Sequence, residues 1–259
     1  MKRKSFIFLF LTFYLIGFAQ NKKIDTANML CSYVYEYLTD TLPGEQLRKE
    51  DLLYLQIGAE CSKCYSYYTY QCDSLMAAPN GDKQWDSFLT EAIGKGLKGR
   101  QLRNAIPHRR MTATIYKNYP QGKITVTDFL LGQYYLYEDA LNSQEWNIES
   151  DSMKVVLGHE CQKATCSFRG RKWTAWFALD VPVSDGPLKF CGLPGLIMEV
   201  YDRGKQYYFC INGMQQVSAT PITFENLDKD FKHLQKINRK DFLISKYRYL
   251  RNQNSINEA

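Results

Sequence analysis

The amino-acid sequence predicts a mainly β protein of the α+β class: a curved antiparallel sheet or a partly open barrel, with a short helix near residues 85–93 and a C-terminal helix. Three observations predict this fold class. Segments rich in aromatic and β-branched residues recur at strand length, and turn residues separate them. Two of these turns, at residues 168–171 and 202–205, join neighbouring segments as hairpins. The tail from residue 224 to about 251 contains no Gly or Pro and spaces its apolar residues as a helix does.

The first half of the chain mixes both kinds of element. Aromatic and β-branched residues predict strands at 29–38, 52–57 and 65–70. Four apolar residues at helical spacing predict the short helix: Trp85, Phe88, Leu89 and Ala92. The following residues, 94–110, are basic and contain several glycines, so we expect an irregular segment there.

Strands dominate beyond residue 110, and the expected ranges are 111–116, 123–127, 134–138, 154–157, 173–179, 196–201 and 206–211. The strand at 173–179 alternates most clearly. Its uniformly apolar face is predicted to be core: Trp173, Ala175, Phe177 and Leu179. Trp176 and Asp180 fall on the other face, which we expect to line a cavity or to lie under another element.

The N-terminus has the pattern of a secretion signal. Residues 2–4 are basic, residues 5–18 are mostly apolar, and small residues follow. We therefore expect a signal peptide at 1–19 and one β-rich domain at 20–259, exported to the periplasm or cell envelope of a Gram-negative bacterium. The helical segment at about 224–251 would end this domain. The signal is shorter than the roughly 20 residues that span a bilayer, and no later segment predicts a transmembrane span.

Charge and motif context argue against nucleic acid and nucleotide ligands. The formal net charge of +6 falls to +3 once the three basic residues of the signal are removed, which is too small to indicate nucleic acid. Gly94, Gly96 and Gly99 match a dinucleotide-binding spacing but follow a predicted helix, so no cofactor is predicted. The basic stretch at 95–123 is interpreted as a solvated loop, with anion binding as the alternative.

Eight cysteines in a chain predicted to be exported indicate structural disulfides, whose connectivity stays open. The alternative to disulfides is a metal or redox role for the motif Cys61-Ser-Lys-Cys64, with Cys72 nearby. No second such pair and no His at ligand spacing completes a zinc site, so no metal site is predicted. Aromatic sequence follows the pair, where a redox motif needs a helix.

Glycine and proline interrupt an apolar run at residues 191–197. Gly permits backbone angles closed to other residues and Pro fixes φ, so the run is either a shaped entrance to a strand, which we favour, or a surface that a ligand approaches closely. No catalytic residue is predicted, because the three histidines accompany no known nucleophile or zinc-protease motif. The candidate ligand-binding residues are Trp176, Asp180, Gly186, Pro187, Gly192, Pro194 and Gly195.

Several short motifs of the second half occur in a fixed order: Gly158-x-x-Cys161, Gly170-Arg171-x-Trp173, Asp180-Val181-Pro182, Gly186-Pro187 and Gly192–Ile197. With this combination, over about residues 154–202, the chain resembles the GLPGLI family of exported bacterial proteins. The resemblance implies export, but the family is functionally uncharacterised, so it implies no catalytic residues. Leu188 departs from the family pattern, which has an aromatic residue after Gly-Pro.

The sequence therefore predicts a non-enzymatic protein of the cell envelope that binds a ligand or partner on a curved β-sheet. The expected partner is an apolar or anionic envelope ligand or another envelope protein. One alternative is an envelope hydrolase whose site is assembled in space from His159, Glu160 and Asp180. The other is the cysteine-based metal or redox protein.

Overall fold

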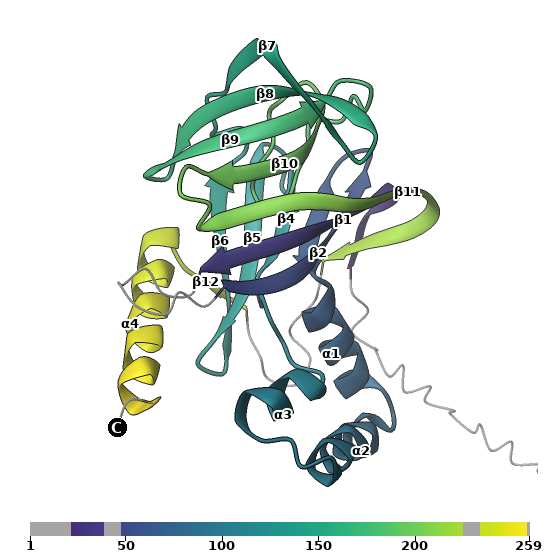
Figure 1. The fold of residues 1–259 in the computed structure, drawn as a ribbon, viewed down its shortest axis with the longest axis vertical. Coiled ribbons are helices and arrows are strands. Elements are labelled where there is room, and N and C mark those ends of the chain that lie inside the picture. The colour runs from purple at the N-terminus through teal and green to yellow at the C-terminus, as the bar shows by residue number, and fades with distance from the viewer. Residues whose placement is uncertain (1–21, 39–47, 225–233, 258–259) are drawn as a thin grey trace, which may run out of the picture.

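The protein folds around one open, curved β-sheet, which confirms the predicted fold class. The structure, a computed structural model, describes residues 22–38, 48–224 and 234–257, so the predicted signal peptide at 1–19 lies outside it. Twelve strands follow one another across the sheet in the order β12-β6-β5-β4-β3-β2-β1-β11-β10-β9-β8-β7. Figure 1 shows β4, β5 and β6 running along the long axis of the molecule, whereas β7 to β11 cross it.

The strands are β1 (Lys22–Leu38), β2 (Arg48–Gly58), β3 (Ser62–Ser66), β4 (Thr114–Lys117), β5 (Lys123–Leu130), β6 (Gln133–Ala140), β7 (Asn147–Val156), β8 (His159–Phe168), β9 (Arg171–Ala178), β10 (Leu196–Asp202), β11 (Tyr207–Phe224) and β12 (Gln235–Lys236). All neighbours pair antiparallel except β12 with β6. The β1–β11 pairing shifts register at three places, and such bulges bend a strand and increase its twist. One face of the sheet is therefore concave.

Three helices follow β3, and two of them differ from the prediction. Helix α2 (Gly81–Gly94) contains the predicted helix at 85–93. Helix α1 (Tyr67–Ala77) replaces the second part of the strand predicted at 65–70, because the Ser66 hydroxyl accepts a hydrogen bond from the Thr69 amide and caps a helix there. Helix α3 (Gly99–Ala105) lies within the segment expected to be irregular.

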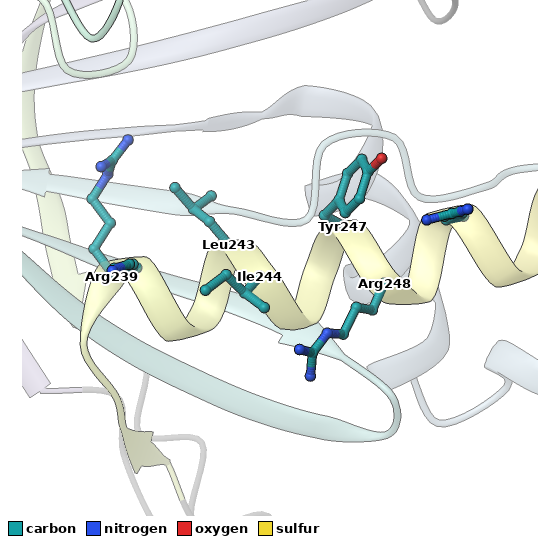
Figure 2. Close-up of a pocket in the computed structure, with 7 residues that line it drawn as sticks. Arg239, Leu243, Ile244, Tyr247 and Arg248 are labelled. Atoms are coloured by element: carbon teal, nitrogen blue, oxygen red, sulfur yellow. The ribbon is translucent and has the colours of Figure 1, made fainter.

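The C-terminal helix is confirmed but begins later than residue 224. Strand β11 continues to Phe224, and α4 (Arg239–Asn257) starts after Asn238, whose side-chain oxygen accepts a hydrogen bond from the Asp241 amide at 2.9 Å. The apolar side chains of the helix fall on two sides. Phe242 packs on β6, whereas Leu243, Ile244 and Tyr247 project from the exposed side (Figure 2).

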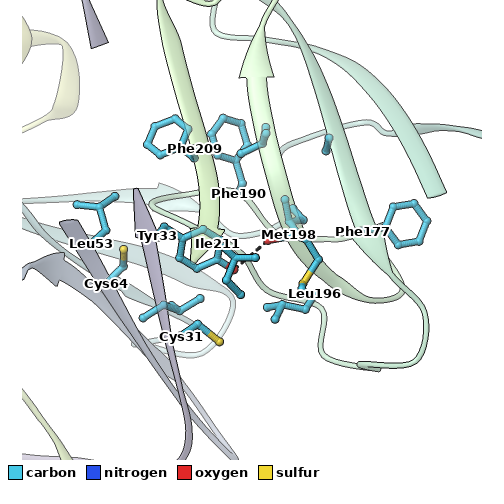
Figure 3. Close-up of a cluster of buried hydrophobic side chains, with 14 of the residues drawn as sticks. Cys31, Tyr33, Leu53, Cys64, Phe177, Phe190, Leu196, Met198, Phe209 and Ile211 are labelled. Carbon is cyan, nitrogen blue, oxygen red and sulfur yellow. Dashed lines mark hydrogen bonds between the residues drawn. The ribbon is translucent and has the colours of Figure 1, made fainter. Parts of the chain in front are cut away.

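The main hydrophobic core covers the concave face. Paired residues share a face of a sheet, and the row Tyr35, Phe209, Val200 and Ala175 is buried across β1, β11, β10 and β9. Figure 3 shows part of this cluster, in which the Tyr33 hydroxyl donates a hydrogen bond of 2.8 Å to the Ile197 carbonyl. The predicted core face of β9 is confirmed up to Phe177. Leu179 is instead exposed, because β9 ends at Ala178.

The eight cysteines are free thiols, so the structure does not support the predicted disulfides. Cys31 and Cys64 face the same core, but both pair with Leu55, so they lie two strands apart. That spacing is roughly 10 Å, whereas a disulfide needs Cα atoms within about 7 Å. Burial raises the pKa of the Cys31 thiol to about 12 and that of Cys64 to about 11, which keeps both protonated at neutral pH.

Candidate functional site

The loop between β9 and β10, residues 179–195, folds onto the concave face of the sheet. Backbone hydrogen bonds join Leu196 to Val181 at 3.0 Å and Ile197 to Asp185 at 2.9 Å, so the loop returns along the start of β10. Two side chains from the segment after β6 hold its far end: Gln144 donates to the Lys189 carbonyl at 2.9 Å, and Trp146 donates to the Cys191 carbonyl at 2.8 Å.

Glycine is required at two places in this loop for different reasons. Gly192 has a φ of 91°, which other residues rarely adopt. At Gly195 the backbone lies against the end of β9, where an added Cβ would overlap the Ala178 carbonyl. The run at 191–197 is therefore a shaped entrance to a core strand, since Leu196 begins β10 directly after this contact.

A buried ion pair fixes the middle of the loop. Lys117, at the end of β4, pairs with Asp185 and also donates to the Gly186 carbonyl. The Lys117 side chain is only 3% exposed, and that of Asp185 is 11% exposed. Burying either charge alone would cost several kcal/mol, and the ion pair offsets this cost only while the two groups stay in contact. The contact therefore places the loop against β4.

Beside the loop, the concave face contains a cavity of about 350 Å³. Its size falls within the range of roughly 300–1,000 Å³ that is typical of small-molecule sites. Strands from both halves of the sheet, the loop and α4 contribute its apolar wall, which consists of Tyr35, Met111, Ala113, Ile115, Val126, Tyr137, Phe168, Trp173, Leu188, Phe190, Tyr207, Phe209, Phe242 and Leu243. Such a wall favours a ligand with an apolar body.

Four basic side chains and one carboxylate complete the lining: Arg169, Arg171, Lys189, Lys246 and Asp128. Each basic group has a carboxylate partner. Arg169 and Lys189 share Asp139 at 3.0 and 2.8 Å. The remaining pairs are Arg171 with Asp202 at 2.7 Å and Lys246 with Asp128 at 2.6 Å.

The ion-pair cluster has an excess of positive charge. Arg239 extends it with an Nε that lies 3.9 Å from Asp139, so that five basic groups meet three carboxylates. The single carboxylate of Asp139 faces three of these basic groups: Arg169, Lys189 and Arg239. An anionic group entering the cavity would therefore find unbalanced positive charge.

Lys189 is the most perturbed of these groups. Burial lowers the pKa of its ammonium to about 8, although Asp139 opposes this shift. The Lys189 Nζ also donates to the Tyr137 hydroxyl at 3.0 Å. Burial alone would raise the pKa of Asp139, but its hydrogen bonds to Lys189 and Arg169 outweigh burial and lower it. Lys189 thus loses its charge near pH 8, well below the usual range of a lysine, inside an apolar site.

Local backbone geometry places these cations. Arg169 and Gly170 have φ values of 52° and 77°, as in the tight turn that suits a two-residue hairpin, and this turn carries Arg169 and Arg171 to the mouth of the cavity. Leu188 adopts a φ of 50°, unusual for a bulky residue. Its amide donates to the Cys64 sulfur at 3.4 Å, which holds this conformation against β3.

The structure separates the predicted binding residues into two groups. Gly186 and Pro187 lead directly into Leu188, Lys189 and Phe190, which line the cavity. Gly192, Pro194 and Gly195 belong to the same loop but lie outside the lining. The predicted glycines and prolines of the loop thus determine its backbone path, and the loop in turn carries the residues that line the cavity.

Trp176 and Asp180 form the second group, away from the cavity. Trp176 pairs with Glu199 on the face of β9 opposite Ala175 and Phe177, where the Lys154 Nζ lies 4.8 Å from the centre of its ring. Its indole Nε1 is buried without a hydrogen-bond partner. Asp180 lies past the end of β9, and its carboxylate is exposed.

His159 and Asp180 come together, as the hydrolase alternative requires, with 2.7 Å between His159 Nδ1 and the carboxylate. Glu160 follows His159 in β8 and therefore points to the other face of the sheet. Cys161 is the nearest nucleophile along the strand, but burial raises the pKa of its thiol to about 11. The pair thus lacks an activated nucleophile beside it in β8.

The metal and redox alternative finds no support in the described residues. Cys61, Cys64 and Cys72 occupy different environments: a small cluster with Ala27, the main core, and helix α1, respectively. Within residues 22–38, 48–224 and 234–257, no group of three or more His, Cys, Asp or Glu side chains is placed to hold a metal ion. No helix in this part of the chain is long and apolar enough to cross a membrane.

Comparisons with known proteins give a match to a family model over a short segment and a likeness in fold. Residues 167–199 match a family described as a protein of unknown function (Porph_ging). No curated protein matches the chain. A solved structure of PNGF-II in a C2 space group is 11% identical with a TM-score of 0.51, over 85% of this chain and 32% of that one. A second PNGF-II structure, in P21, is also 11% identical, with a TM-score of 0.49 over 85% and 33%. The chain thus spans about a third of the length of these relatives, and the likeness concerns the fold alone.

Proposed function

We propose that this protein binds a small anionic ligand with an apolar body, without transforming it, in the cavity on the concave face. The observation that carries the proposal is the combination in one cavity of an aromatic wall with an excess of basic groups. An apolar ligand alone would not require Lys189, Arg169 and Arg171 at the site, because burying them costs free energy. A hydrophilic anion alone would gain nothing from the aromatic wall.

The proposal places this binding protein in the cell envelope. The basic and apolar pattern of residues 1–19 supports export to the periplasm or envelope of a Gram-negative bacterium, with one domain at 20–259. The Gly192–Ile197 motif lies within the matched residues 167–199, which supports membership of the GLPGLI family. Gly186, Pro187, Gly192, Pro194 and Gly195 then act by shaping the loop that carries Leu188, Lys189 and Phe190.

Filling part of the cavity should weaken ligand binding. We expect Leu243→Trp to weaken binding of 1-anilinonaphthalene-8-sulfonate, an aromatic anion, by at least about tenfold, because Leu243 lines the cavity and a larger side chain occupies its space. Ile244→Trp is the matched control: both side chains are 39% exposed and adjacent, but only Leu243 lines the cavity. Fluorescence titration measures both. Equal affinities of the two variants would contradict the proposed site.

The affinity for the same probe should depend on pH through Lys189. Its pKa of about 8 in the free protein means that it loses its positive charge as the pH rises past that value. The sulfonate of the probe stays ionised, so we expect affinity to fall by about tenfold between pH 7 and 9.5, the size of one charge-assisted contact. Lys189→Met should bind weakly at pH 7 and show no such fall. An unchanged pH profile in this variant would remove Lys189 from the site.

A further inference from the structure

Helix α4 is held on one side and open on the other. Phe242 is 1% exposed and its ring lies 5.4 Å from that of Tyr137, while Lys246 pairs with Asp128 at 2.6 Å. These contacts fix the helix beside β6 (Figure 1). The opposite side forms a shallow hollow that is lined by residues of α4 alone, so no wall from another described element restricts access to it.

The open side carries large apolar side chains. Leu243, Ile244, Tyr247 and Leu250 are 39, 39, 66 and 50% exposed. At 3.6 residues per turn, positions 243, 247 and 250 stack along one stripe of the helix. Figure 2 shows Leu243, Ile244 and Tyr247 projecting from this side. Four exposed apolar residues on one side of the helix indicate a surface that another phase or molecule covers.

Basic residues flank the stripe. Lys240, Arg248 and Arg251 line the same hollow and are exposed, whereas Asp241 is the sole acidic residue in the sequence of the helix. A helix with an apolar stripe, flanking cations and otherwise polar residues suits the interface of an anionic bilayer, where apolar side chains enter the acyl boundary and cations meet headgroups. A second copy would present the same positive charge and be repelled.

We propose that α4 docks the protein onto an anionic lipid surface through its open side. Leu243 takes part in both features, since it lines the concave cavity as well as the open side of the helix. Docking would therefore bring the mouth of the cavity to the lipid surface. The proposal does not depend on ligand binding in the cavity, because only the open side of α4 is required.

Vesicle binding tests the charge contribution. The full chain is titrated with phosphatidylcholine vesicles and with vesicles containing phosphatidylglycerol, and the ratio of the two association constants is measured. The basic residues 2–4 also favour the anionic vesicles, but they are the same in every variant, so the change in this ratio between variants reports on α4. Each basic residue near an anionic surface contributes about fivefold. We expect a ratio of at least about 100 for the wild type and a decrease of about 30-fold in Lys240→Gln/Arg248→Gln.

The matched control removes the same charge elsewhere. Lys98 and Arg103 are exposed at the start and end of α3, so Lys98→Gln/Arg103→Gln should leave the ratio within about twofold of the wild type. An equal decrease in both double variants would show binding by net charge and overturn the proposal. So would a wild-type ratio near one. Sedimentation without lipid completes the test by measuring self-association. If the wild type self-associates but does not bind vesicles, and Lys240→Gln/Arg248→Gln abolishes the self-association, the open side binds a second copy instead of lipid.

The apolar stripe has its own test. Ile244→Ser/Leu250→Ser keeps every charge but removes two apolar contacts, and we expect at least tenfold weaker binding to the anionic vesicles. Circular dichroism checks that α4 stays folded. Binding unchanged by this variant would show that lipid does not cover the stripe and would overturn the docking geometry.

Discussion

Replacing Asp185 by alanine is expected to lower the free energy of unfolding by about 3–5 kcal/mol, because it leaves a buried charge without its partner. The variant leaves Lys117 buried on the concave face without its counter-charge, with only the Gly186 carbonyl as an acceptor. It also removes the acceptor of the Gly186 amide, which donates to Asp185 at 2.7 Å. Urea unfolding at neutral pH measures the change.

Two further variants separate charge burial from general disruption. Glu36→Ala breaks an ion pair whose partners, Glu36 and Arg48, are 33 and 46% exposed, and should cost no more than about 1 kcal/mol. Lys117→Met/Asp185→Ala removes both buried charges and should recover most of the stability. If Asp185→Ala costs no more than Glu36→Ala, Lys117 is not desolvated and the loop is held by other contacts.

Replacing Gly195 by alanine is expected to destabilise the fold by about 3 kcal/mol, the upper part of the range for an overfilled core. The new Cβ would overlap the Ala178 carbonyl oxygen and lie 2.7 Å from its carbonyl carbon. Because these are backbone atoms at the end of β9, a rotamer change cannot relieve the overlap. The loop must move away from the sheet instead.

Gly94→Ala serves as the control for this substitution. Gly94 ends α2, and nothing lies within 4 Å of the added Cβ. In a helix, alanine is more favourable than glycine by up to about 1 kcal/mol, so this variant should be neutral or slightly stabilised. Urea unfolding of both variants compares them, and equal stabilities would contradict the close approach of residue 195 to β9.

Side-chain alternation predicts much of the sheet because it depends on local sequence. Trp173, Ala175 and Phe177 alternate with Thr174 and Trp176, and the structure buries the first set in the concave core. Helix α1 is not predicted from the sequence because its tyrosines are equally typical of a strand. One local hydrogen bond, from the Thr69 amide to the Ser66 hydroxyl, caps the helix and favours it over the strand.

The cavity was beyond local prediction because its walls come from distant parts of the chain. Alternation separates Trp176 from the core face, but it does not reveal that the core face also contains the cavity, between β9, β6 and α4. The turn at 168–171 was recognised as a hairpin, yet only the folded sheet brings Arg169 to Asp139 and Lys189. The local sequence signal for the cavity is Lys189, a charged residue between the apolar residues Leu188 and Phe190.

The pairing of β1 with β11 has a consequence for how the chain folds. On one side of this pairing, strands β2 to β6 follow the order of the sequence, and on the other side so do β7 to β11, so within each part every strand pairs with its neighbour in the sequence. The two parts join where Tyr33 meets Ile211, which are far apart along the chain. Closing such a distant pairing costs loop entropy before it gains contacts, so we expect it to be the slow step of folding. During synthesis, the edge of β1 that faces β11 therefore stays unpaired until β11 has left the ribosome.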